Sequence, residues 1–515
     1  MLNLIELPQF SWLRPVSTFD QHEGTNSTPP VEEKPLSAIW DSPDLATPIR
    51  NIVTDMLATC QVPYSILPYN QELHDLCIEE CLRKGYPLDR NGLEYSIEKY
   101  IASGIYMSPA YKHLPNIATK AWIAIFTAFA SCIDDVMTME NVSHLEVFGQ
   151  RLISGQQQAN PLLDGFARLL KEIPDHWRGL QGDIILGSSI SFVAGCIIEI
   201  QTEGEQPSVH ARRYPTFYRV LSGVSEAYSM FIWPPEVPFQ NFIQSVPEIS
   251  MYINCMNDVL SFYKEEMKGE TVNYITLQAE SRGKPKLLIL QQLAQDVATC
   301  HNRAVCMLEE KDSKTNYPAS IPTARASYHD SFTSDHWRGL QGDIILSSSI
   351  NYMSACMIEI QTEGEQPSVH ARRYPTFYRV LSGICESYSM FIWPPEVPFQ
   401  NFIQSVPEIS MFINCMNDVL SFYKEEIRGE TVNYVTLQAE SRGEPKLSIL
   451  QQLAQDVATC HNRAVCMLEE KDSKTSYPSS IPTARGSYQG FAVGYVSFHA
   501  SYVKRYRLNE LGSGW

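Results

Sequence analysis

The sequence predicts an all-α fold, and three observations support this class. Apolar residues recur every three or four positions in IRNIVTDMLATC (49–60), QELHDLCIEECLRKG (71–85) and EYSIEKYIASGIYM (94–107), which is the spacing of one helix face. Proline and glycine end these stretches, as in Gly-Tyr-Pro at 85–87. No convincing stretch alternates apolar and polar residues as a half-buried strand would.

Composition bounds the kinds of partner that the chain can take. Of its 515 residues, 44% are hydrophobic and 11% aromatic, which is enough for a substantial core. The net charge of −18 argues against nucleic acid or an anionic membrane surface as partner. An anionic substrate would therefore need divalent metal ions or a few placed arginines to supply positive charge.

The cysteines and the N-terminus indicate a cytoplasmic protein. The thirteen cysteines include no Cys-x-x-Cys pair and no disulfide-framework spacing, so reduced and mostly buried thiols are expected. The opening MLNLIELPQFSWL has neither a basic segment nor a long apolar core, and no signal peptide is expected. Residues 1–48 are predicted to form a mobile arm, because 16–48 are rich in proline, serine, threonine and acids.

The apolar run AWIAIFTAFASCI at 121–133 predicts a buried helix, because its thirteen residues fall short of the ~20 that span a bilayer. The adjacent carboxylates Asp134 and Asp135 end this run, and Glu140 follows. Carboxylates beside an apolar helix are costly unless a metal or another cation meets them. A helix cap or a solvated turn is the alternative, and it would be preferred for an isolated Asp-Asp pair.

The dominant feature of the chain is an internal repeat. Residues 175–325 (copy 1) align with 335–485 (copy 2) at a constant offset of 160, and 133 of the 151 aligned positions are identical. Solenoid repeats have periods of roughly 20–50 residues, so this unit is instead half a domain that has been copied. Removing one 160-residue unit from 515 leaves 355 residues, a natural size for one large helical domain.

The segment MNDVLSFYKEE occurs in both copies, at 256–266 and 416–426. A helix turns ~100° per residue, so positions i, i+4 and i+8 share one face. An amide oxygen, a hydroxyl and a carboxylate in such a column suit a hard cation such as Mg²⁺. The columns are Asn257, Ser261 and Glu265 in copy 1, and Asn417, Ser421 and Glu425 in copy 2.

An exposed polar helix face is the alternative interpretation of these columns. The flanking SMYINCM and SFY are strongly apolar, which predicts a largely buried helix whose polar stripe faces a cavity. Lys264 and Lys424 adjoin the glutamates, where each could meet an anion that the metal also touches.

The Asp-Asp pair, followed about 120 residues later by N-D-x-x-S-F-Y-K-E, resembles the motifs of class I terpene cyclases, and within them the trichodiene synthase group of fungal sesquiterpene cyclases. The segment YPTFYRVLSGVSEAYSMFIWP at 214–234, repeated at 374–394, is similar to the segment of that group whose arginine senses diphosphate. The matching residues are Arg219 and Arg379.

The tail GYVSFHASYVKRYRL at 494–508 resembles the terminal helix of the same group, whose Arg-Tyr pair contacts diphosphate and here matches Arg505 and Tyr506. With the repeat counted once, the resemblance covers about 49–508.

The resemblance implies a bundle of antiparallel helices around an apolar pocket, in which three Mg²⁺ ions clamp the diphosphate of farnesyl diphosphate, a prenyl diphosphate. The product would be a sesquiterpene hydrocarbon or alcohol. Asp134 would bind metal from one wall and the Asn/Ser/Glu column from the facing wall. The diphosphate donors implied are Arg219, Lys264, Arg505 and Tyr506, with Arg379 and Lys424 as their equivalents in copy 2. Trp122, Phe126 and Phe129 could line the pocket, although an aromatic stripe is more typical of a core.

The chain also departs from the group. An acid usually stands four residues after the first aspartate, where this chain has Thr138, so the part of Glu140 as a ligand stays open. Prenyl transferases carry two aspartate-rich motifs, whereas this chain has one Asp-Asp pair in a helical apolar context. A proton-initiated cyclase needs Asp-x-Asp-Asp, and here Cys132 occupies the first of those positions. A catalytically inactive duplicated protein that binds prenyl diphosphate or acts in assembly is a further alternative.

The duplication leaves two arrangements open. Copy 1 can dock on the N-terminal half with copy 2 outside, or copy 2 can complete the site with copy 1 extruded. The first is favoured, because the N-terminal half and copy 1 emerge together during synthesis. An unmatched copy would expose apolar faces or exchange into a second chain, giving a homodimer. The predicted segments are the arm 1–48, the N-terminal half 49–174, copy 1 at 175–325, a linker 326–334, copy 2 at 335–485 and a terminal helix within 486–515.

Overall fold

The computed structural model describes residues 46–60, 69–88, 95–111, 113–315, 324, 355, 358–359, 362, 367–368, 370–393, 397–430, 432–476 and 483–501. Within these ranges every regular element is a helix, which confirms the all-α class. Nearly all of the predicted arm, the whole linker 326–334, and the tail residues Arg505 and Tyr506 lie outside the described residues.

The N-terminal half is arranged around α5 (Ile117–Val136). Asn116 caps this helix by accepting a hydrogen bond from the Ala118 amide, and the predicted run 121–133 is buried along it. Helix α4 lies so close that a Cβ on Gly104 would stand 2.1 Å from the Ala124 carbonyl oxygen, so only glycine fits there. The surrounding helices are α3 (Gln71–Lys84), α4 (Ile101–Met107), α6 (Val142–Glu146), α7 (Phe148–Ile153), α8 (Pro161–Leu170) and α9 (Ile173–His176).

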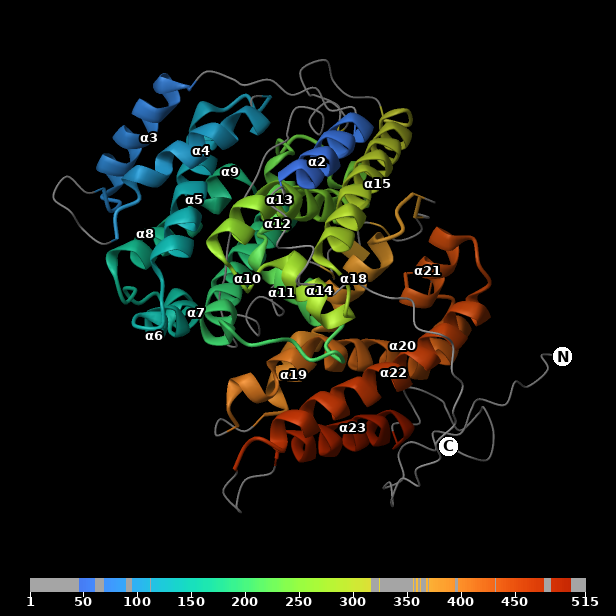
Figure 1. The fold of residues 1–515 in the computed structure, drawn as a ribbon. Helices are drawn as coiled ribbons and strands as arrows, with labels where there is room; N and C mark the ends of the chain where they lie inside the picture. The colour runs from blue at the N-terminus through green and yellow to red at the C-terminus, as the bar shows by residue number, and fades with distance from the viewer. Residues whose placement is uncertain are drawn as a thin grey trace.

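The two copies form matching sets of helices, drawn from green to yellow and from orange to red in Figure 1. Copy 1 contributes α10 (Leu180–Thr202), α11 (Tyr214–Ser222), α12 (Ser225–Phe231), α13 (Val246–Lys268), α14 (Tyr274–Arg282) and α15 (Lys286–Asp312). Copy 2 contributes α18 (Tyr374–Gly383), α19 (Cys385–Phe391), α20 (Val406–Arg428), α21 (Tyr434–Arg442) and α22 (Lys446–Asp472).

Helix α12 of copy 1 packs into the N-terminal half. The Thr127 hydroxyl of α5 lies 3.1 Å from the Tyr228 hydroxyl, and the Phe126 and Phe231 rings meet edge to face at 5.3 Å. Tyr228 is 1% exposed, whereas its counterpart Tyr388 on α19 is 46% exposed. This tyrosine is therefore part of the core in copy 1 and of the surface in copy 2.

A different helix covers the same face of each copy. Helix α2 (Ala46–Cys60) lies on α13 and α15, where its Met56 shares a core with Tyr252. Helix α23 (Ala484–Ser501) lies on α20 and α22, where the Tyr488 hydroxyl contacts His461 Nδ1 at 3.1 Å. Figure 1 shows α2 along α15 and α23 beneath α22. The N-terminal and C-terminal helices thus take equivalent places on the two copies.

Two of the described helices, α5 and α10, are long and apolar enough by length and composition to cross a membrane. In this fold 72% and 78%, respectively, of their most apolar windows are buried against other helices. The buried helix predicted at 121–133 is part of the first.

The contact between His461 and α23 predicts a pH-dependent docking of that helix. Burial lowers the pKa of His461 from 6.5 to about 4. Between these two values the folded state binds fewer protons than the unfolded state, so docking of α23 should weaken as the pH falls from 7 to 5. Hydrogen exchange in 484–501, corrected for intrinsic rates, should speed up over that range.

The His461→Gln variant is the control for this prediction. Glutamine can keep a hydrogen bond to Tyr488 but does not titrate, so the variant should lose most of the pH dependence. Equal pH dependence in both proteins would contradict the role given to His461.

Candidate active site

The copy 1 column lies on α13, which begins after Ser245 with proline in its first turn and ends at Gly269, where φ is 72°. Asn257 and Ser261 are buried, and Glu265 is half-buried. In copy 2, Ser421 is buried while Asn417 and Glu425 are half-buried. Each column is thus partly buried on its helix.

Arg219 of α11 reaches this stripe in copy 1. Its Nη2 donates to Asn257 Oδ1 at 2.7 Å and to the Asn254 carbonyl at 3.2 Å, and its Nε forms a 2.8 Å ion pair with Asp258. The guanidinium is thus held between two helices by a carboxylate and two amide oxygens. Gly223 allows the close approach, because a Cβ there would stand 2.1 Å from Asn254 Oδ1.

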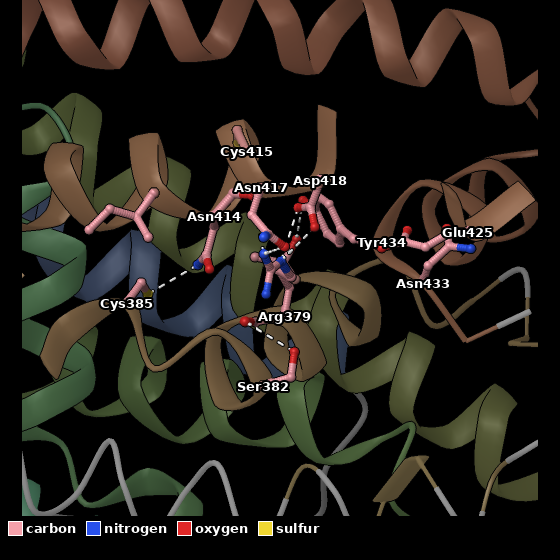
Figure 2. A network of polar contacts seen from close by, with 12 residues as sticks. Arg379, Ser382, Cys385, Asn414, Cys415, Asn417, Asp418, Glu425, Asn433 and Tyr434 are labelled. Atoms are coloured by element: carbon pink, nitrogen blue, oxygen red, sulfur yellow. Dashed lines mark hydrogen bonds and ion pairs between the residues drawn. The ribbon is translucent and has the colours of Figure 1, made fainter. Parts of the chain in front are cut away.

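Copy 2 repeats this network, as Figure 2 shows. Arg379 forms a 2.8 Å ion pair with Asp418 and donates to Asn417 Oδ1 at 3.1 Å. Burial raises the pKa of Asp418 to about 6, although Arg379 opposes the shift. Asn417 Nδ2 also lies 3.2 Å from His499 Nε2 of α23, so the terminal helix reaches the copy 2 column.

The two aspartates at the end of α5, Asp134 and Asp135, have different neighbours. Asp135 is exposed and accepts a 2.8 Å hydrogen bond from the Tyr100 hydroxyl. Burial and, second, the charge of Asp134 raise the pKa of Tyr218, so Asp134 lies near α11 of copy 1. Tyr218 precedes Arg219 and donates a hydrogen bond to Glu199 of α10. The charge of Asp134 thus acts on α11, the helix that also carries Arg219.

The equivalent tyrosine of copy 2 has the equivalent hydrogen-bond partner. Tyr378 donates a 3.0 Å hydrogen bond to Glu359, the counterpart of Glu199, and its pKa is raised by burial and then by that glutamate. After burial, the leading charge is that of Asp134 at Tyr218 and that of Glu359 at Tyr378.

Glu140 lies exposed in a turn beyond α5. The Thr138 amide donates to Asn141 Oδ1 at 2.7 Å, and the Glu140 amide to the Thr138 hydroxyl at 3.3 Å. Thr138 therefore shapes the turn at the position where an acid was expected. The turn borders an open hollow of about 640 Å³ between the ends of α5, α10 and α13, lined by Met139, Ile200, Gln201, Glu203, Gly204, Gly269, Glu270 and Thr271.

The donor set of each column fits magnesium. The Ser261 and Ser421 hydroxyls are buried without a hydrogen-bond partner, as expected of oxygens placed for a cation. In the described part of the chain no three His, Cys, Asp or Glu side chains converge, so a metal here would depend on amide and hydroxyl oxygens as well. Such oxygens are suitable ligands for Mg²⁺.

Of the two predicted lysines, only Lys424 has a side chain that the structure describes. Lys424 is buried and pairs with Glu425 at 3.4 Å, whereas the Lys264 side chain lies outside the described residues. Trp122, Phe126 and Phe129 are at most 2% exposed within the aromatic core, and no aromatic residue lines the hollow beside Met139.

Sequence reasoning missed Tyr100, Glu199 and Tyr218. Asp258 and Asp418 stand inside the repeated motif directly after its asparagine, and their charge could have indicated a partner for the buried arginines. Nothing in the spacing of the two tyrosines distinguishes them from core aromatics.

Comparison with known families shows to which family the chain belongs. The sequence pattern of the trichodiene synthase family matches residues 110–336 and again residues 324–513. The chain belongs to the trichodiene synthase family. The first match contains copy 1 with part of the N-terminal half, and the second contains copy 2 with most of the terminal segment.

Individual members of the terpene synthases are similar over about half of this chain. Alpha-cuprenene synthase COP6 of Coprinopsis cinerea is 32% identical over 261 residues, covering 51% of this chain and 80% of that enzyme. Terpene synthase BipA of Cochliobolus sativus is 33% identical over 238 residues, covering 45% and 71%. Longiborneol synthase CLM1 of Gibberella zeae is 30% identical over 254 residues, covering 47% and 74%.

Ser261 and Ser421, whose hydroxyls have no hydrogen-bond partner, give a test of metal binding. Ser261→Ala and Ser421→Ala each remove a buried hydroxyl whose lack of a partner costs about 1–3 kcal/mol, so both variants should be at least as stable as the wild type without metal. The rise in Tm caused by Mg²⁺ with diphosphate should shrink in Ser261→Ala, as measured by scanning calorimetry. An undiminished rise in both variants would contradict a ligand role.

Proposed function

We propose that this chain uses Mg²⁺ to ionise farnesyl diphosphate and cyclise it to a sesquiterpene hydrocarbon or alcohol, at a site formed by the N-terminal half and copy 1. Membership of a terpene synthase family supports the reaction class. The single observation that supports the location is the placement of Asp134 near Tyr218, which adjoins the arginine that binds Asn257.

Each side chain has a defined part in this proposal. Asp134 would hold metal from α5, with Asp135 and Glu140 as secondary candidates. Asn257, Ser261 and Glu265 would hold metal from α13. Arg219 would bind diphosphate oxygens, joined by Lys264 and by Arg505 and Tyr506 from the tail. By resemblance three Mg²⁺ ions are expected, and when bound they neutralise diphosphate charge as the C–O bond breaks.

Arg219 is suited to stabilising the leaving group. Its side chain is 11% exposed and its guanidinium is already oriented by Asp258, so little reorganisation is needed when charge develops on the diphosphate. The electron pair of the C–O bond leaves with the diphosphate oxygen, and an allylic cation remains. Ring closure by attack of a double bond, followed by loss of a proton or capture of water, gives a neutral hydrocarbon or alcohol.

Exclusion of water is the second requirement of this chemistry. The released cation must be kept dry until ring closure. In copy 1 the wall between α5 and α12 is closed by buried aromatic residues, whereas Tyr388 at the same place in copy 2 is exposed. Copy 1 therefore meets the requirement better than copy 2.

An inactive, diphosphate-binding role has one observation in its favour, and it concerns copy 2. Arg379, Asn417 and Asp418 keep there, beside α23, the same arginine contacts as in copy 1. Copy 2 could thus hold a prenyl diphosphate without turning it over. We also propose a cytoplasmic location, where a water-soluble diphosphate would be available.

The first test is turnover. Purified protein incubated with farnesyl diphosphate and Mg²⁺ under a hexane overlay should yield a sesquiterpene detectable by gas chromatography with mass spectrometry, and EDTA should abolish it. Geranyl and geranylgeranyl diphosphates in parallel report chain-length preference. Release of diphosphate is measured in the same samples. Absence of any product from all three substrates would contradict the proposal.

The repeat supplies a matched pair of variants that tests the location. Asn257→Ala should lower turnover at least about 100-fold, the scale of losing one group that stabilises the transition state. Asn417→Ala removes the same side chain from copy 2 and should leave most activity. Loss of activity only in Asn417→Ala would assign the reaction to copy 2 instead.

A further inference from the structure

Contacts between the two copies occur in pairs whose roles are exchanged. The Ser208 amide of copy 1 donates to Gln404 Oε1 of copy 2 at 3.0 Å, and the Ser368 amide of copy 2 donates to Gln244 Oε1 of copy 1 at 3.0 Å. The offset of 160 turns Ser208 into Ser368 and Gln244 into Gln404. Each contact is therefore the counterpart of the other.

Two buried carboxylates form ion pairs that are exchanged between the copies in the same way. Glu248 of copy 1 is 0% exposed and pairs with Arg373 of copy 2 at 2.6 Å. Glu408 of copy 2 is also 0% exposed and pairs with Arg213 of copy 1 at 3.2 Å. A buried carboxylate is costly without a cation, so each copy supplies what the other needs.

Each glutamate also lies 3.5 Å from an arginine of its own copy, and these arginines correspond as well. They are Arg303 for Glu248 and Arg463 for Glu408. The charged residues that copy 1 brings to the interface are thus the same as those of copy 2, each 160 positions earlier in the sequence.

The apolar residues between the copies are exchanged in the same way. Tyr214 and Leu221 of copy 1 belong to the core cluster that contains α20 and α22 of copy 2. Tyr374 and Leu381 of copy 2 belong to the cluster that contains the end of α15 of copy 1. All four are at most 7% exposed. Figure 1 shows α18 beside α15, although it belongs to copy 2.

Reciprocal contacts of this kind define an isologous interface, in which one surface is complementary to itself about a two-fold axis. We infer that each copy carries a self-complementary docking surface whose partner is a second copy of the same half, and that this chain satisfies the surface internally. Copy 2 acts as the built-in partner subunit of copy 1. A second chain is then not needed to cover this face.

The interface also joins helices that carry the candidate site. Arg213 is the N-cap residue of α11, the helix of Arg219, and Glu248 lies in the first turn of α13, the helix of Asn257. Pairing with copy 2 therefore fixes the starts of both helices of copy 1. This consequence depends on the proposed function, whereas the interface does not.

Cross-linking in the full-length chain tests the inference. Ser208→Cys with Gln404→Cys, and its two-fold mate Gln244→Cys with Ser368→Cys, place thiols across the interface. A short bismaleimide should join each pair within one chain, to similar extents and independently of protein concentration. The introduced cysteines identify the copy by peptide mass, since 201–212 and 361–372 are otherwise identical.

Single-cysteine variants control for the native thiols, and the outcomes are distinct. A covalent dimer at either pair would overturn the internal assignment. Linkage at one pair alone, or at neither, would overturn the two-fold relation. None of these results depends on catalytic activity, so failure here is distinguishable from failure of the proposed reaction.

Double-mutant cycles provide a second measurement that requires no cross-linker. Arg373→Ala with Glu248→Ala, and Arg213→Ala with Glu408→Ala, should each show a coupled loss of Tm, in which the double variant is less destabilised than the sum of its single variants. Additive effects in both cycles would overturn the inference.

Discussion

The clasp of a buried arginine between α11 and α13 is the interaction on which the candidate site depends. Arg219 is held by Asp258, Asn257 and the Asn254 carbonyl, and glycine at 223 allows the two helices to approach. Removing one partner of such a buried pair typically costs about 3–5 kcal/mol, because the other charge is left uncompensated. The clasp therefore fixes the orientation of Asn257 and of Arg219 together.

Helical periodicity was enough to predict the fold class and the two polar columns. A period of four residues places Asn257 above Ser261 whatever the tertiary structure, and apolar neighbours predict that the stripe is buried. Periodicity could not predict which side chain would meet the column. Arg219 and Asn257 are separated by 38 residues in sequence, and only the packing of α11 on α13 brings them together. The contact of Tyr100 with Asp135 likewise depends on how a neighbouring turn lies beside α5.

The duplication shows that nearly identical segments of this chain can have different surroundings. Tyr228 and Tyr388 lie in nearly identical segments, yet one is buried against α5 and the other is exposed, because the chain has a single N-terminal half. The helices that cover the copies differ as well, α2 on copy 1 and α23 on copy 2. Each copy supplies an arginine to the buried glutamate of the other, in addition to the arginine of that glutamate's own copy. These ion pairs and the apolar residues between the copies join the two halves within one chain.

The central claim is that Asp134 and the copy 1 column meet on one metal–diphosphate cluster. Its most direct test is a crystal structure of the full chain with Mn²⁺ and diphosphate, in which anomalous scattering locates the metal. The account predicts anomalous peaks between Asp134 and Asn257, with diphosphate oxygens at Arg219. Peaks only beside Asn417, or metal bound at Asp134 with none near Asn257, would contradict it.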